Sequence, residues 1–186
     1  MAVRESRLID NFSGAGSLVY SMANKINQDV GRSSVFIKLE KEAGGDEPSL
    51  LISQSLIQGN WAKQDTIHIL RSSMKVYDCD MIDNYAHEVT HGFTMVASEV
   101  WIEKTRISNT SEMRNKLQKL RLASVDTGFF NLYLGSTLAI FNDSVIKNLV
   151  AQKQGVISAI SQSSVYTTTG VRFVDNASFN KEGFTM

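Results

Sequence analysis

Residues 85–109 most constrain the fold, because this stretch contains signals for two incompatible backbone conformations. It includes His87-Glu88-Val89-Thr90-His91, the one string in the chain that looks like enzyme chemistry. In a helix, His87 and His91 would share a face and could hold a zinc ion, with Glu88 as general base. In a strand, the two histidines would still share a side, but Glu88 would point away and the zinc-peptidase geometry would be lost.

The residues around the histidine pair favour the extended conformation. β-branched and aromatic side chains are dense from Val89 to Ile107, and such residues suit a pleated sheet better than a helix. Gly92 directly follows the second histidine and would weaken a helix by roughly 1 kcal/mol relative to alanine. We therefore expect two extended segments, at residues 84–97 and 98–107.

A zinc site would need a third protein ligand and an open position for water. Glu112 lies 21 residues beyond His91, a spacing that resembles the third ligand of thermolysin-like zinc peptidases. Glu112 also fits a helix-capping role, three residues after Asn109. The alternative enzyme hypothesis is thus a zinc metallopeptidase with His87, His91 and Glu112 as ligands and Glu88 as base.

Apolar residues alternate with polar ones along much of the chain, which is typical of strands with one buried face. We expect strands at residues 33–41, 49–57 and 65–78, with a slip at 71–73 interpreted as a bulge. Further short strand-like runs follow residue 128, although 145–153 fits a short helix as well. His68 lies between Ile67 and Ile69 and is expected to be a solvent-side or cross-strand histidine. No internal repeat is evident.

One amphipathic helix is predicted at about residues 110–123. Asn109 and Glu112 resemble a capping box, and the apolar stripe consists of Met113, Leu117 and Leu120. The basic residues on its remaining surface are expected to be solvated, with a binding role as the alternative; they are Arg114, Lys116, Lys119 and Arg121.

The sequence as a whole predicts a mainly β (α+β) fold, arranged as a β-sandwich or partly closed barrel with one helix. We divide it into an N-terminal helical or extended segment (1–31), a β-rich tube-like domain (32–176) and a C-terminal tail (177–186). Apolar residues at roughly helical spacing favour a helical conformation for the first segment, with a break near Gly14 and Gly16.

Composition narrows the function classes. Lysine plus arginine (19) equals aspartate plus glutamate (19), which argues against a protein that holds nucleic acid by bulk charge. A single cysteine, Cys79, excludes an internal disulfide and a cysteine-rich metal site. No apolar run approaches the ~18 residues of a membrane helix, and the N-terminus lacks a signal-peptide hydrophobic region. We expect a cytoplasmic product without a membrane partner.

Residues 66–175 combine a long strand, the phrase HEVTHGF…ASEVWIEKTRISN, the helix SEMRNKLQKLRLAS and strands that end in GVRFVDN. This order resembles the Dit-like baseplate and tail-tube proteins of long-tailed bacteriophages and related contractile injection systems. The chain departs from that pattern because ASEVWIEK lacks the proline-arginine junction common there, and residues 1–31 have no counterpart.

The resemblance implies a non-enzymatic β-sandwich subunit in a virion tail, assembled in the host cytoplasm. It implies a ring of copies, typically sixfold, that contacts neighbouring tail or baseplate proteins. DNA would be only a cargo in the central channel, and the protein would have no catalytic residues, cofactor or metal. A viral matrix or capsid-like protein of another group is a further hypothesis that the sequence does not separate from this one.

Overall fold

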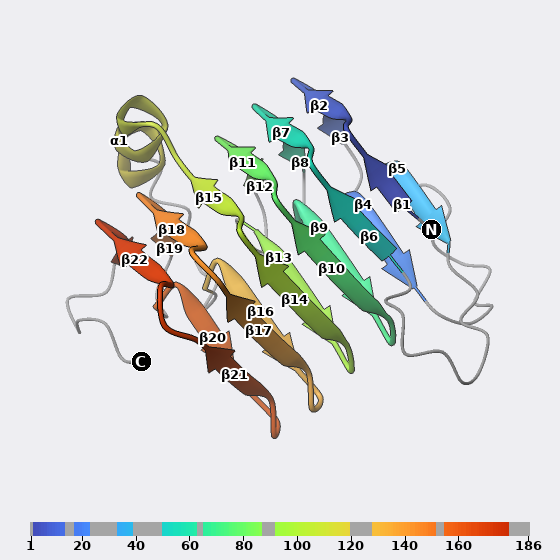
Figure 1. Cartoon of the computed structure of the whole chain (residues 1–186). Coiled ribbons are helices and arrows are strands. Elements are labelled where there is room, and N and C mark those ends of the chain that lie inside the picture. Colours follow the sequence, from blue (N-terminus) through green and yellow to red (C-terminus); the bar gives the residue numbers. More distant parts are fainter. Residues whose placement is uncertain are drawn as a thin grey trace.

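The computed structural model describes residues 2–13, 17–22, 33–38, 50–62, 65–86, 92–119, 128–151 and 155–178. It confirms a mainly β fold with a single helix in the described part of the chain, α1 (Ser111–Lys119). No helix among the described residues is long and apolar enough to cross a bilayer. Short strands follow one another along the chain and return to the same position after each turn (Figure 1).

The strands form three six-stranded sheets and two small ones, in which all described pairings are parallel. Sheet A contains β1 (Ala2–Arg4), β6 (Leu50–Ser53), β10 (Ser73–Tyr77), β14 (Glu99–Glu103), β17 (Thr137–Phe141) and β21 (Ser164–Thr167). Sheet B contains β2 (Arg7–Ile9), β7 (Leu56–Gln58), β11 (Asp80–Ile82), β15 (Arg106–Ser108), β18 (Val145–Lys147) and β22 (Arg172–Val174). Sheet D contains β5 (Ser33–Lys38), β4 (Ser17–Met22), β9 (Ile67–Leu70), β13 (Phe93–Val96), β16 (Phe130–Tyr133) and β20 (Ile157–Ala159). Sheet C contains β3 (Phe12–Ser13), β8 (Trp61–Ala62) and β12 (Tyr85–Ala86), and sheet E contains β19 (Val150–Ala151) and β23 (Ala177–Ser178).

Each coil of the chain contributes one strand in turn to sheets A and B, and most coils also contribute one to sheet D, so the architecture is a parallel β-helix. Figure 1 shows the coils side by side, with the N-terminal strands at one end of the stack and the C-terminal strands at the other. The expected sandwich or partly closed barrel is therefore replaced by a stack of coils. The alternating pattern identified the strands, but it does not say whether successive strands pair with each other or with the next coil.

The core is made of rows of inward-facing side chains that repeat from coil to coil. In sheet A the row of Leu50, Met74, Val100 and Leu138 is fully buried, and adjacent strands hold these residues in register. Burying each such side chain stabilises the fold by roughly 1.5–3 kcal/mol. Each strand supplies only one or two inward residues, and these residues pack against their register partners in the adjacent coils. The core rows therefore stabilise the contact between neighbouring coils.

Asparagines line the corner that follows sheet B. Asn60 is buried, and its Nδ2 donates to the Leu8 carbonyl (2.8 Å) and to Asn84 Oδ1 (2.8 Å), while its Oδ1 accepts from the Asn11 backbone N–H (2.9 Å). Asn84 Nδ2 likewise donates to the Ile57 carbonyl of the preceding coil (2.7 Å). This ladder of amides satisfies backbone groups that the corner removes from the sheets.

Hydroxyl groups do the same at the other two corners. Between sheets D and A, the N–H groups of Ser72, Ser98 and Ser136 donate to the side chains of Ser98, Ser136 and Ser163. Between sheets A and B the ladder includes Ser55, Thr105 and Ser144, with Cys79 in place of a hydroxyl. The Cys79 thiol donates to the Tyr77 carbonyl (3.2 Å), and burial raises the pKa of this thiol, which keeps it a protonated donor.

The corners also contain residues in the left-handed backbone region, which costs a non-glycine residue roughly 1–2 kcal/mol and is best tolerated by Asn and Asp. They include Glu5, Gln54, Asp78, Lys104 and Asp143 between sheets A and B, Asp10, Asp83, Asn148 and Asp175 after sheet B, and Arg71 and Ala97 between sheets D and A. Arg71 is thus a corner residue, and the slip expected at residues 71–73 is a change of sheet and not a bulge.

An internal repeat is present, although none is evident in the sequence. Partners in the corner ladders lie 24 residues apart at Asn60 and Asn84, 26 at Cys79 and Thr105, and 27 at Leu149 and Asn176. The separation grows to 39 between Thr105 and Ser144, where α1 is inserted into a coil. The repeat is not evident in the sequence because its length varies and because each coil constrains the residue type at only a few positions.

Three further expectations about elements are corrected. The first segment is extended and not helical where it is described, since it supplies β1 to β4. The Thr110 hydroxyl, and not Asn109, caps α1 by accepting the Met113 N–H (3.2 Å). The amide of Asn109 instead reaches the neighbouring coil at the Asn148 carbonyl (3.4 Å). The alternative of a short helix at residues 145–153 is wrong, because β18 and β19 lie there.

We predict that Asn60→Ala lowers the free energy of unfolding by about 2–4 kcal/mol, because it leaves several buried backbone and side-chain groups without partners. Urea denaturation measures the change. Asn115→Ala, at an exposed position of α1, is the matched control and should alter stability by less than about 0.5 kcal/mol. Equal effects of the two substitutions would contradict the role assigned to the ladder.

Candidate functional site

The residues of the predicted zinc site are only partly placed. The described residues do not include His87, Glu88, Val89 and His91. The strand conformation expected around Val89 therefore also lies outside the described part of the chain. The flanking residues are extended, because β12 ends at Ala86 and β13 begins at Phe93. Glu112 lies in the first turn of α1 and is exposed. No cluster of three or more His, Cys, Asp or Glu side chains occurs among the residues that the structure describes.

Gly92 has a packing role that its sequence position did not reveal. A Cβ atom at this position would lie 2.6 Å from Cε1 of the Phe129 ring and 2.6 Å from the Phe129 carbonyl oxygen. Phe129 is nearly fully buried, and its ring contacts that of Phe93. Gly92 therefore permits the close approach of two coils at the start of β13, immediately after the histidine string.

The third histidine belongs to a polar cluster on sheet D. His68 Nδ1 lies 2.8 Å from Oδ2 of the buried Asp65, and Thr94, its neighbour in register, donates to Asp65 Oδ1 at 2.7 Å. Burial, together with the charge of Asp65, raises the pKa of Tyr133. The carboxylate fixes the orientation of the imidazole ring, an arrangement that serves general-base catalysis where a substrate cavity adjoins it.

A small interior cavity lies near this cluster but has no room for a substrate. Its volume is about 10 Å³, and its lining includes Thr66, Asn84, Phe93 and Phe129. That is the space of roughly one water molecule. The Asp65–His68–Thr94 cluster is therefore best explained as a satisfied cross-strand network, as expected for His68 from the sequence.

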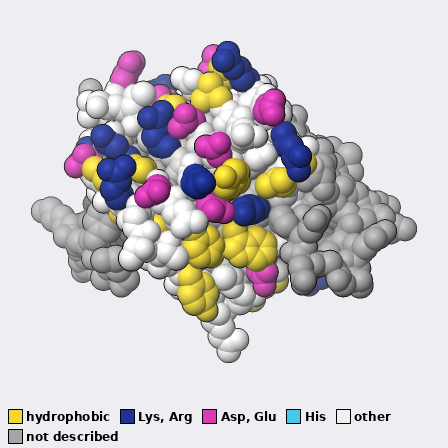
Figure 2. Space-filling view, viewed as in Figure 1, with side chains coloured by type: hydrophobic (Ala, Val, Ile, Leu, Met, Phe, Trp, Pro, Cys, Tyr) yellow, Lys and Arg dark blue, Asp and Glu magenta, His cyan; other side chains and the backbone are white. Residues whose placement is uncertain are grey.

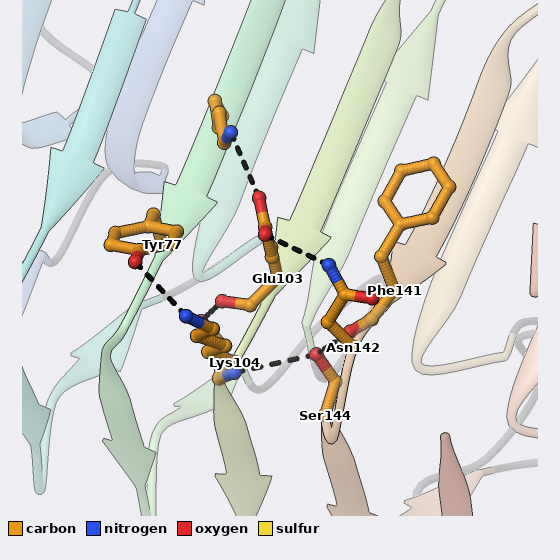
Figure 3. A network of polar contacts seen from close by, with 8 residues as sticks. Tyr77, Glu103, Lys104, Phe141, Asn142 and Ser144 are labelled. Atoms are coloured by element: carbon orange, nitrogen blue, oxygen red, sulfur yellow. Dashed lines mark hydrogen bonds and ion pairs between the residues drawn. The ribbon is translucent and has the colours of Figure 1, made fainter. Parts of the chain in front are cut away.

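Charged side chains form a second network on the outer surface, across β10, β14 and β17 (Figure 3). Lys75 Nζ lies 2.9 Å from Glu103 Oε2, and Asn142 Nδ2 donates to Glu103 Oε1 at 2.9 Å. Hydrogen bonds from Lys75 and Asn142 lower the pKa of Glu103. Lys104 Nζ donates to the Tyr77 hydroxyl (3.4 Å), which raises the pKa of Lys104. The network connects three successive coils.

The face of the molecule seen in Figure 2 has no large area of charge of one sign. Lysine and arginine side chains are interspersed there with aspartate and glutamate, and hydrophobic side chains lie between them. Arg106 and Asp80, for example, pair at 3.1 Å with both side chains about half exposed. This distribution agrees with the formal net charge of zero.

The C-terminal end of the coil stack, formed by β20, β21 and β22, exposes residues that are core residues in the other coils. Val165 is 36% exposed and Phe173 is 37% exposed, whereas their register partners Leu138 and Ile146 are fully buried. Ile160, just after β20, is 43% exposed. The apolar interior is thus open at this end.

Comparison with known proteins gives no relatives: no protein-family model, curated protein or solved structure matches this chain. The functional argument therefore depends on the architecture and its surfaces. Sequence reasoning missed the open end because its residues look like ordinary strand residues. Their exposure follows only from the order of the coils.

We predict that Glu103→Gln lowers the free energy of unfolding by about 0.2–1 kcal/mol at neutral pH. Because the pKa of Glu103 is lowered in the folded state, its stabilisation is present above the pKa of the unfolded carboxyl group and is lost as the pH falls through the folded-state value. The difference between the two proteins should therefore vanish in acid, as measured by urea denaturation across pH. The control is Glu99→Gln, at the exposed start of the same strand. A difference that persists below the folded-state pKa would contradict this assignment.

We predict that the purified protein contains substoichiometric zinc and keeps its melting temperature after chelation and after His91→Ala. Elemental analysis and thermal denaturation measure these quantities. Stoichiometric zinc that is lost in His91→Ala, with a fall in melting temperature, would contradict this prediction and instead support a zinc site at the histidine string.

Proposed function

We propose that this chain is a non-enzymatic structural subunit of a phage tail or contractile injection particle, and that it works by associating with copies of itself. The observation that carries this proposal is the open coil stack. In the described part of the chain, sheets A and B end in β1 and β2 at one end and in β21 and β22 at the other.

Strand edges of this kind favour association. An outermost strand presents backbone N–H and C=O groups that can pair with another chain. Solenoid proteins gain stability from contacts between neighbouring repeats, and their terminal repeats usually carry a polar outer face. Here the last coil instead exposes the apolar side chains of Val165 and Phe173. Covering them would extend the core by the same contacts that build it.

The particle assignment derives from the resemblance to Dit-like tail proteins, and the fold modifies what that resemblance implies. It implied a β-sandwich, whereas the chain is a parallel β-helix. The proposal of a sixfold ring around a channel is thus supported only by the resemblance. The coil stack itself favours association along its axis, because that is the direction in which its sheets are open.

Sedimentation velocity of the purified chain over about 1–100 μM tests the proposal, since a self-associating protein changes its mean mass with concentration. We predict species larger than the monomer that increase with concentration and that negative-stain images show as rings, rods or fibres. A protein that is strictly monomeric at every concentration, alone and with the products of adjacent genes, would contradict the proposed function.

A further inference from the structure

We infer that copies associate head to tail, with the C-terminal end of one coil stack continued by the N-terminal end of the next copy. The N-terminal end consists of β1, β2 and β5. This inference rests on the proposed self-association and specifies the surfaces, the partner and the register.

The two ends have complementary steps. Sheets A, B and D each contain six strands, but sheet D is displaced by one coil. At the N-terminal end, β5 extends sheet D one strand beyond the coil of β1 and β2. At the C-terminal end, sheet D stops at β20, one coil before β21 and β22 in the described part of the chain. When β1 and β2 of one copy pair with β21 and β22 of another, β5 therefore comes to lie beside β20, and all three sheets continue without a missing strand.

The register within the chain fixes the residues that would meet. In sheet A, Val3 continues the inward row of Ile52 and Ile140, which ends in Thr167 of β21, so Val3 would lie beside Thr167. Val165 ends the other inward row of this sheet, which contains Leu50 and Leu138. Phe173 would likewise lie beside Leu8 in sheet B. The exposed Phe173 side chain of the last coil would thus be covered by the apolar Leu8 side chain of the first.

The asparagine ladder could also continue from one copy to the next. Within the chain, the Asn176 amide donates to the Ile146 carbonyl, and its Oδ1 accepts the Leu149 N–H of the preceding coil. Asn11 occupies the same corner position in the first coil, and its Nδ2 already donates to Asn60 Oδ1. In the stack, its second amide hydrogen would donate to the Phe173 carbonyl of the preceding copy, and its Oδ1 would accept the Asn176 N–H of that copy.

One contact in this register opposes association and makes the register testable. Arg172 lies in the outward row of sheet B that also contains Asp80, Arg106 and Val145, and Arg7 would take the next place in that row. Asp80 and Arg106 form an ion pair in this row. Two arginines on adjacent strands repel each other instead. The stack should therefore tighten when salt screens this repulsion.

A charge-reversal cycle tests the register. We predict that Arg172→Glu and Arg7→Glu each lower the dissociation constant about three- to tenfold, because each creates an opposite-charge pair between copies. The double variant restores a like-charge pair and should return close to the wild-type value. Arg106→Glu, in the middle of the same row, is the control and should leave association unchanged. Arg7 and Arg172 lie at opposite ends of one chain, so contacts within a monomer do not produce this pattern.

Disulfide trapping provides a second measurement that does not depend on charge. Tyr166 and Ala2 would be outward neighbours on β21 and β1, about 4.8 Å apart, within the range of Cα separations that a disulfide spans. In a Cys79→Ser background, Ala2→Cys mixed with Tyr166→Cys should give a crosslinked dimer, whereas either variant alone should not. Circular dichroism checks that each variant folds.

The outcomes separate this inference from the proposed function. Self-association without tightening in either single reversal, and without the Ala2→Cys/Tyr166→Cys crosslink, would overturn head-to-tail stacking while leaving a self-associating subunit. Absence of any self-association would overturn both. Tightening in the two single variants, reversal in the double variant and the mixed crosslink would together establish the stack.

Discussion

Hydrogen bonding between coils at the corners is the constraint on which this structure depends. A coil can lie on its neighbour only if the chain turns at the same place each time, and each turn removes backbone groups from the sheets. Small polar side chains replace those partners: the amides of Asn60 and Asn84 after sheet B, and the hydroxyl groups of Ser98 and Ser136 before sheet A. The apolar rows between the corners then pack in register, because the ladders fix the position of every strand along the axis of the coil stack.

The sequence predicts the type of structure more readily than its topology. Period-two alternation correctly indicated strands at residues 33–38, 67–70 and 73–77, and helical spacing indicated the helix that begins at Ser111. Neither signal distinguishes pairing between consecutive strands from pairing between coils. The ladder residues were visible as Ser, Asn and Asp between apolar runs, but they looked like ordinary turn residues. The insertion that carries α1 lengthened one period and concealed the repeat.

The sequence likewise predicts some features of the candidate sites and not others. His68 could be assigned from the sequence as a cross-strand histidine, since its apolar neighbours Ile67 and Ile69 are fully buried in β9. Gly92 was read as a residue unfavourable to a helix, whereas its close contact with Phe129 gives it a packing role. The open end could not be found in this way, because Val165 and Phe173 are exposed only by being last in the stack. Functional surfaces of a solenoid depend on the position of a coil as much as on its residues.

Electron microscopy of the assembled protein, with measurement of its axial repeat, tests this account most directly. Sheets A, B and D each contribute six strands per copy, and parallel strands lie about 4.8 Å apart, so head-to-tail stacking predicts an axial rise of about 29 Å per copy. The 4.8 Å spacing itself should run along the axis of the assembly. A closed ring, or a fibre whose 4.8 Å spacing is not aligned with its axis, would contradict a coil stack continued from copy to copy.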